Sequence, residues 1–177
     1  PKIFYYDIDQ SDVDQLATDL VNLGFSTASV EANTAGLGFD IGAGGAITDQ
    51  LDFELGFVYM GQFELTASMT GPTETITAKS HAWSIPAGLK YKLGTSDANV
   101  YIKGGGHYWK QVSDIGSSKG TVNMWGTGLD PMIGIGGEIG GLILSYEHYS
   151  FSGVGVGAGI AGESGISALS LQYKSAF

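Results

Sequence analysis

Apolar and polar residues alternate one by one along several long stretches of the chain. The clearest stretch is residues 51–65, where one set of alternate positions is large and apolar. This set is Leu51, Phe53, Leu55, Phe57, Tyr59, Phe63 and Leu65. The other set is small or charged at most positions, as at Asp52, Glu54 and Gly56. Because the side chains of a β-strand point alternately to its two faces, the pattern predicts a strand with one apolar face.

Similar alternation along the rest of the chain predicts eight strands. They cover residues 2–9, 34–47, 50–65, 79–93, 98–112, 121–139, 142–151 and 165–177. Most are longer than the roughly 5–6 residues usual in soluble sheets, and long enough for the about 9–11 residues that a tilted strand needs to cross a bilayer. The sequence has no apolar run of the roughly 18 residues that a transmembrane helix requires.

The predicted connections alternate between short and long. Short turns are expected at residues 48–50, 94–97 and 140–141, and long links at 10–33, 66–79, 113–121 and 152–164. This alternation is typical of an up-and-down outer-membrane barrel with short periplasmic turns and long external loops. Within the first long link, Val13, Leu16, Leu20 and Leu23 have helical spacing before Gly24, which predicts a short amphipathic helix.

The polar face of the predicted strands shows which side of the sheet faces lipid. It is mostly glycine and alanine, with isolated charges at Asp40, Glu54, Lys90, Lys103 and Glu138. Small residues and a few ions suit the narrow lumen of an eight-stranded barrel, so the apolar face would point to lipid. A closed sheet also pairs every backbone amide, as hydrocarbon requires. The alternative is a soluble β-barrel that binds a hydrophobic ligand, with the apolar face turned inward.

Aromatic residues of the apolar face cluster at both ends of the predicted strands. Phe53, Tyr91, Tyr173 and Phe177 lie near the short turns, and Phe63, Trp83, Tyr108, Trp125 and Tyr146 lie near the long links. Aromatic side chains gather at the two interfaces of a membrane, so these residues predict two girdles.

Composition narrows the possible functions. Only 15% of the residues are charged, against about 25% in soluble domains, and there are 29 glycines and no cysteine. Disulfides and cysteine-based metal or redox chemistry are therefore excluded. The formal net charge is −10, with eight lysines and no arginine. Such a chain lacks the basic face that nucleic-acid binding needs.

Three stretches and the C-terminal end carry a resemblance to a known family. They are GLGFDIGAGGAITDQLDFELGFVYMGQF (36–63), GLKYKLGTSDANVYIKGGGHYWK (88–110), GTGLDPMIGIGGEIGGLILSYEHY (126–149) and LSLQYKSAF, which ends at Phe177. The chain resembles the OmpA-type eight-stranded outer-membrane barrels. The resemblance implies an ion-pair network in the lumen formed by Glu54, Lys90, Lys103 and Glu138. It also implies that Tyr173 and Phe177 carry the signal read by the barrel-assembly machinery.

The expected protein is an integral, monomeric barrel of the bacterial outer membrane, exported through the periplasm. No secretion signal is expected within the 177 residues, which begin at Pro1 without a charged and apolar leader. Its expected partners are outer-membrane lipids, lipopolysaccharide and the barrel-assembly machinery, with no cofactor or metal. We expect a structural or small-pore role, with external loops for surface interaction and a lumen closed or narrowed by the ion-pair network.

A catalytic alternative rests on residues 146–150, YEHYS. His148 and Ser150 share a face there, and Glu163 follows. The pattern resembles the active site of lipid A deacylase barrels, in which a serine nucleophile faces the outer leaflet. Under this alternative the protein would be a lipid-modifying enzyme of the outer leaflet.

Overall fold

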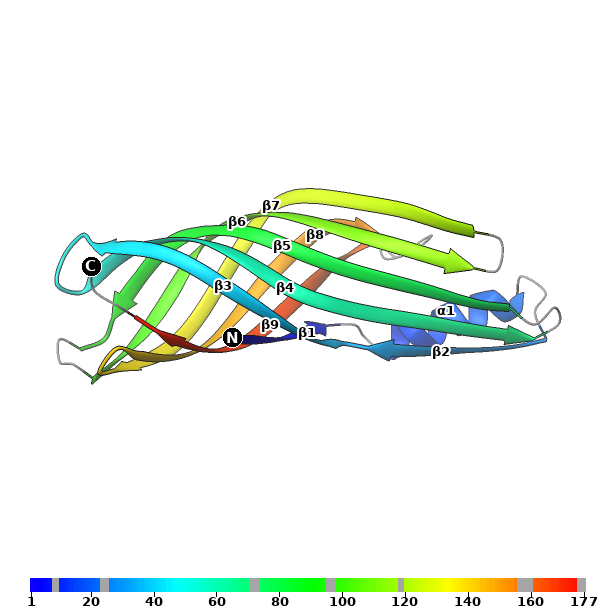
Figure 1. Ribbon diagram of the computed structural model, residues 1–177, viewed down its shortest axis with the longest axis horizontal. Coiled ribbons are helices and arrows are strands. Elements are labelled where there is room, and N and C mark those ends of the chain that lie inside the picture. Colours follow the sequence, from blue (N-terminus) through cyan, green and yellow to red (C-terminus); the bar gives the residue numbers. More distant parts are fainter. Residues whose placement is uncertain are drawn as a thin grey trace.

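The computed structural model describes residues 1–7, 10–22, 26–70, 74–94, 98–117, 120–155 and 161–174. Nine strands and one helix follow one another along the chain in these ranges. They are β1 (Lys2–Asp7), α1 (Gln10–Asn22), β2 (Thr27–Asn33), β3 (Ala35–Ala46), β4 (Leu51–Thr70), β5 (Glu74–Lys92), β6 (Ala98–Ser117), β7 (Gly120–Ile139), β8 (Leu142–Gly155) and β9 (Ala161–Tyr173). All strand pairings are antiparallel (Figure 1).

The sheet closes into a barrel because β4 pairs with β5 in addition to β3. Strands β2 and β3 pair with consecutive segments of β4, so they form one long wall strand interrupted at Thr34. The described residues therefore form a ring of eight wall strands, β3-β1-β9-β8-β7-β6-β5-β4, in which β2 extends β3. The predicted all-β, eight-stranded antiparallel barrel is confirmed.

Several strands are longer than the alternation predicted. The strand expected to end at residue 65 continues to Thr70 and pairs with β5 as far as Glu74, and β6 and β7 pair as far as Ser117 and Gly120. Most of the residues expected in the links 66–79 and 113–121 are thus strand residues, where threonine, a good strand former, is frequent. Figure 1 shows β4 to β7 continuing past the ends of β8 and β9.

The first long link holds the predicted helix. It runs over Gln10–Asn22 as α1 and lies beside β2, and Val13 is buried. Leu23 and Gly24, where the helix was expected to end, lie outside the described residues. Among the described residues, no helix is both long and apolar enough to cross a membrane.

The outward positions of the barrel strands are exposed and largely apolar. Leu37, Ile41 and Leu129, for example, are each at least 70% exposed. The inward positions of the same strands hold glycines, charged residues and a buried apolar group. Strand β1, whose facing the sequence did not reveal, points Lys2, Phe4 and Tyr6 inward and Ile3 and Tyr5 outward.

A β-bulge at Gly61 corrects the prediction for one end of β4. The register with β5 shifts between Tyr59 and Gln62, and Gly61 has a φ of 78°. One extra residue turns every later side chain to the other face of the sheet. The prediction that Phe63 belongs to the outer aromatic girdle is therefore wrong. Phe63 is 3% exposed, and its ring centroid lies 4.5 Å from that of Tyr6 in the interior. Leu65 is buried for the same reason.

Candidate functional site: the interior of the barrel

The inward positions nearest the short turns carry an ion-pair network of ten residues. Its members are Lys2, Asp40, Asp52, Glu54, Lys90, Lys92, Lys103, Glu138, Glu147 and Lys174. Five lysines face five carboxylates, so the formal charge of the network is zero. Five of the eight lysines of the chain are gathered here.

Glu147 on β8 is the most enclosed carboxylate of the network. Its two oxygens lie 2.6 Å from the Nζ atoms of Lys2 and Lys103, and it is 1% exposed. The hydroxyl of Ser145 donates to Glu147 at 3.1 Å, and the hydroxyl of Tyr149 also donates to it. Lys2 in turn lies 3.0 Å from Asp40 on β3. The carboxylate of Glu147 is therefore held by four donors, two from β1 and β6 and two from its own strand β8.

Lys90 on β5 is the second centre of the network. Its Nζ lies 2.9 Å from Glu54, 3.6 Å from Asp52 and 3.9 Å from Glu138. Lys103 joins the two centres, because its Nζ is 2.6 Å from Glu147 and 3.7 Å from Glu54. The ion pairs thus run without interruption across the lumen.

The four residues proposed from the family resemblance, Glu54, Lys90, Lys103 and Glu138, all lie in this network. Sequence reasoning missed its most buried pair, Lys2 and Glu147. Lys2 lies in a short strand with apolar residues on both faces, which hid its direction. Glu147 could have been found, since it shares a parity with Ser145 and Tyr149, opposite to the apolar residues Leu142, Leu144 and Tyr146.

Glycines on β7 make room for these long side chains. A Cβ atom at Gly134 would lie 3.0 Å from Cγ of Glu147 and 3.1 Å from Cγ of Lys103. At Gly128 a Cβ atom would lie 2.6 Å from the Trp109 ring. The inward glycines that the sequence assigned to a narrow lumen are therefore sites where side chains of β6 and β8 lie across β7.

A second layer, farther from the short turns, is apolar. Its residues are Phe4, Tyr6, Val58, Met60, Phe63, Leu65, Ala82, Trp109, Met132, Tyr149, Phe151, Ile166 and Ala168. Each is at most 8% exposed. On β8, for example, Tyr149 and Phe151 follow Glu147 along the same face. The barrel interior therefore consists of an ionic layer and an apolar layer, one above the other.

Buried polar groups within the apolar layer have partners. The Nε2–H of His107 donates to the Ser150 carbonyl oxygen at 2.8 Å, so its Nδ1 accepts from the Ser84 hydroxyl at 2.9 Å. The indole N–H of Trp109 donates to Asp130 at 2.6 Å. Asp130 also accepts from the backbone N–H and the hydroxyl of Ser152, at 2.9 and 2.6 Å. These bonds tie β5 to β8 across the interior.

The remaining predicted girdle residues lie on the outside of the barrel. Exposed rings are those of Phe53, Tyr91, Tyr108, Trp125, Tyr146 and Tyr173. Trp83 is half-buried between Phe57 and Tyr108, at centroid distances of 6.1 and 5.9 Å. Phe177, half of the proposed assembly signal, lies outside the described residues.

His148 and Ser150 share the outward face of β8, as the catalytic alternative requires. His148 contacts Ser167 on β9, directly opposite in the register, with 3.2 Å between Nδ1 and Oγ. The hydroxyl of Tyr146 donates to the same Oγ at 2.9 Å. The side chain of Glu163 lies outside the described part of the chain. Within the described ranges, no three His, Asp or Glu side chains are grouped to hold a metal ion.

The sequence matches the family described as the outer membrane protein beta-barrel domain over residues 9–165. A search of curated proteins finds no match. The soluble alternative needed the apolar face to point inward, whereas the described barrel strands carry it outward. The match covers most of the chain, and the described strands form a closed antiparallel barrel. The chain therefore belongs to the outer membrane β-barrel domain family and is an integral protein of the bacterial outer membrane.

Proposed function

We propose that this barrel has a closed lumen and serves as a structural and surface-exposed protein of the outer membrane, not as an open pore. The observation that carries the proposal is the filled interior. An ionic layer of ten residues lies nearest the short turns, and an apolar layer of thirteen residues lies farther from them. The central side chains of both layers are almost fully buried.

Each layer opposes the passage of ions for a different physical reason. To open the ionic layer, an ion pair of Glu147 or Lys2 must break, and breaking a buried ion pair costs about 3–5 kcal/mol. The apolar layer offers no polar surface to replace the hydration shell of an ion, and a hydrophobic constriction blocks conduction by excluding water. We infer that rearranging one layer alone leaves the other as a barrier.

The hairpins β4–β5 and β6–β7 support the surface role. They continue past β8 and β9 at the end remote from the short turns, which is the external end in barrels of this kind (Figure 1). We propose that they present a surface to external partners and that lipopolysaccharide and other outer-membrane lipids surround the wall. We also propose that the barrel-assembly machinery recognises the last strand through Tyr173 and Phe177, and that the protein functions as a monomer without catalytic turnover.

Conductance measurements test the closed lumen. The full chain, refolded and inserted into a planar bilayer, is expected to show no steady single-channel current. The double variant Lys103→Met with Met60→Ala opens both layers at once and is expected to give discrete openings or a loss of thermal stability. Lys79→Met is the matched control, because Lys79 pairs with Glu64 at 3.4 Å and is more than half exposed. A steady current through the unaltered protein contradicts the proposal.

A further inference from the structure

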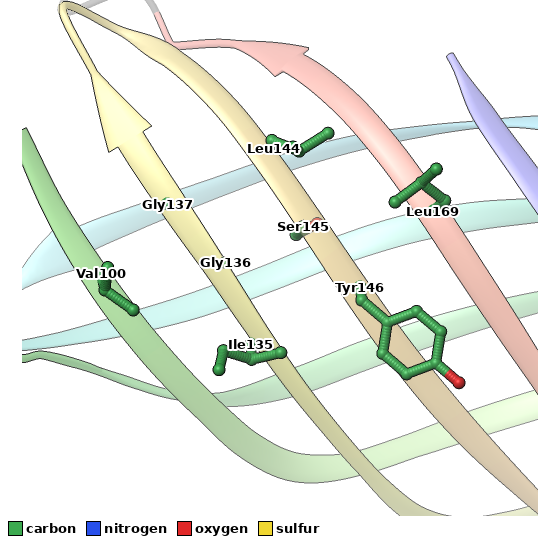
Figure 2. Close-up of a pocket in the computed structure, with 8 residues that line it drawn as sticks. All are labelled: Val100, Ile135, Gly136, Gly137, Leu144, Ser145, Tyr146 and Leu169. Atoms are coloured by element: carbon green, nitrogen blue, oxygen red, sulfur yellow. The ribbon is translucent and has the colours of Figure 1, made fainter.

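Strand β7 is paired on both sides over only part of its length. Near its turn to β8 it has two neighbours, and Figure 2 shows Ile135 of β7 beside its register partner, Tyr146 of β8. The pairing with β8 ends at Met132, whereas the pairing with β6 continues without a register shift to Gly120. Among the described residues, 120–131 therefore pair with β6 alone. We call the side of this segment that faces away from β6 the β7 edge.

Pro131 explains where the pairing with β8 stops. The turn residues Gly140 and Gly141 both have a positive φ, as a two-residue type I′ turn requires, so Ile139 and Leu142 beside the turn form a hydrogen-bonded pair. Odd-numbered residues of β7 therefore direct their N–H and C=O groups toward β8, and even-numbered residues direct theirs toward β6. At position 131 the proline has no N–H to donate to β8.

Backbone groups of β8 near this point are bonded to side chains instead of to β7. The Ser150 carbonyl oxygen accepts from His107, and the Ser152 N–H donates to Asp130. In the part of the chain that the structure describes, no strand pairs with the odd-numbered backbone groups of β7 beyond the proline. These groups belong to Thr121, Asn123, Trp125, Thr127 and Leu129.

The β7 edge lacks the features that usually protect a strand edge. Proteins block such edges with charged side chains, proline or a bulge. Residues 120–129 contain no charged residue and no proline, and the pairing with β6 has no bulge there. Large apolar side chains are exposed on both faces, Trp125 and Leu129 on the outward face and Val122 and Met124 on the inward face. Such an edge is a template for another strand.

The other edge of the same part of the sheet is protected. There the outer end of β4 pairs with β2, which carries the charged residue Glu31 and lies beside α1. Figure 1 shows β6 and β7 continuing past the end of β8. Trp125, an exposed girdle residue, marks the outer interface of the membrane, so residues 120–124 extend beyond it. The β7 edge can therefore be reached from outside the cell.

We propose that the β7 edge binds an extended segment of an external protein, which joins the sheet as an antiparallel strand. The inference rests on the external role proposed above for the β6–β7 hairpin. Main-chain hydrogen bonds supply the affinity in such complexes, and the side chains select the partner. Because Trp125 and Met124 are exposed on opposite faces, the segment is expected to be uncharged, with β-branched or apolar residues on both faces.

A second copy of the chain fits the β7 edge less well. Two barrels in one membrane hold their β7 strands in the same direction, so the two edges could pair only in parallel. Parallel pairing is slightly less stable per residue than antiparallel pairing, and every strand pairing within this barrel is antiparallel. An external segment has no such restriction on its direction.

Fluorescence anisotropy of a labelled synthetic peptide tests the proposal on the full chain refolded in lipid nanodiscs. The probe has about eight alternating threonine and valine residues, which favour an extended strand, and a lysine at each end for solubility. The unaltered protein is expected to bind it. The same peptide with N-methyl groups at consecutive central residues has both hydrogen-bonding edges blocked and is expected to bind at least about tenfold more weakly. Equal binding of the two peptides overturns the proposal.

Asn123→Pro blocks the β7 edge from the side of the protein. The proline removes an N–H that points to the open side and keeps the bonds to β6, as Pro131 does in the same strand. Asn123→Ala is the matched control, because it removes the same side chain and keeps the N–H. Asn123→Pro is expected to bind the unmodified peptide at least about tenfold more weakly than Asn123→Ala, and equal binding overturns the proposal.

Two checks accompany this comparison. A heat-modifiable shift on electrophoresis shows whether each variant has folded, and the two peptides decide the matter on the unaltered protein if Asn123→Pro does not fold. A dimer of the unaltered protein in native mass spectrometry that Asn123→Pro separates would assign the β7 edge to a second copy and overturn the proposal.

The external placement of the β6–β7 hairpin is tested separately. The chain has no cysteine, so Asp114→Cys, at an exposed outward position of β6, provides a single site for labelling. In intact cells this variant is expected to react with a membrane-impermeant maleimide, whereas Asp49→Cys, in a short turn, is expected to stay unlabelled. Labelling of Asp114→Cys without peptide binding overturns the edge proposal alone. Failure of that labelling overturns the external role and the edge proposal with it.

Discussion

Lys2 Nζ lies 2.6 Å from Glu147 Oε2 in the interior of the barrel, and both side chains are 1% exposed. The two residues are 145 positions apart in the chain and come from β1 and β8, which are separated in the sheet by β9. Their contact spans the inner face of β9 and forms only when β1, at the start of the chain, has paired with β9, near its end. The pair therefore links the electrostatics of the interior to closure of the barrel.

Replacement of Lys2 by methionine is expected to destabilise the folded barrel by about 1–3 kcal/mol, because the buried Glu147 keeps Lys103 but loses one charged donor. Urea unfolding in detergent, followed by tryptophan fluorescence, measures this difference in the free energy of unfolding. The control is Lys79→Met, which removes an exposed pair and is expected to cost no more than about 1 kcal/mol. Equal effects of the two substitutions would show that the buried pair contributes no more than a surface pair.

The sequence was informative about strand faces because a two-residue period is a local property. Tyr101, His107 and Trp109 occupy alternate positions of β6, as a shared face requires, and the structure buries all three. Alternation did not reveal where the period breaks. Gly61 is one glycine among 29, and only the pairing with β5 shows that it adds an extra residue to β4. Strand ends were missed where polar strand residues resemble loop residues.

Gly61→Ala is expected to lower stability by about 1–3 kcal/mol, the usual range for a residue forced into a sparsely populated backbone region. The φ of Gly61 is 78°, and a Cβ atom there would lie 2.7 Å from the Leu37 carbonyl oxygen. The thermal midpoint of the heat-modifiable electrophoretic shift measures the loss. Gly106→Ala, at an open position of β6, should leave that midpoint nearly unchanged. A similar midpoint for both variants would mean that the bulge relaxes.

The interior site was only partly predictable for a different reason. Inward charges on long alternating strands, such as Glu54 and Lys90, can be recognised from parity, and a narrow lumen leaves them few places to go. Which charges meet depends on the order of strands around the ring and on their register. One partner of Glu147, Lys2, comes from the other end of the chain, and no local pattern could indicate it.

Asp130→Asn tests the bonds that hold β8 to β7 within the apolar layer. Asp130 accepts three hydrogen bonds, one from Trp109 and two from Ser152, and an asparagine offers a single acceptor oxygen to these donors. The asparagine oxygen can still accept from the two N–H donors, and the Ser152 hydroxyl can turn to accept from the amide, but the bonds lose their charge-assisted strength. A loss of about 1 kcal/mol is therefore expected in urea unfolding. Asp114→Asn on β6 is the control, since Asp114 is exposed and its substitution should change stability by no more than about 0.5 kcal/mol.

Ser150→Ala tests whether the protein cleaves lipid A. We expect the refolded protein to release no 3-hydroxyacyl chains from lipid A, and Ser150→Ala to behave in the same way, because His148 contacts the hydroxyl of Ser167. The backbone carbonyl of Ser150 keeps its hydrogen bond from His107 in the variant, so we expect the fold to be unchanged. Mass spectrometry of the lipid fraction after prolonged incubation makes the measurement. Acyl release by the unaltered protein that disappears in Ser150→Ala would instead identify an outer-leaflet deacylase with Ser150 as its nucleophile.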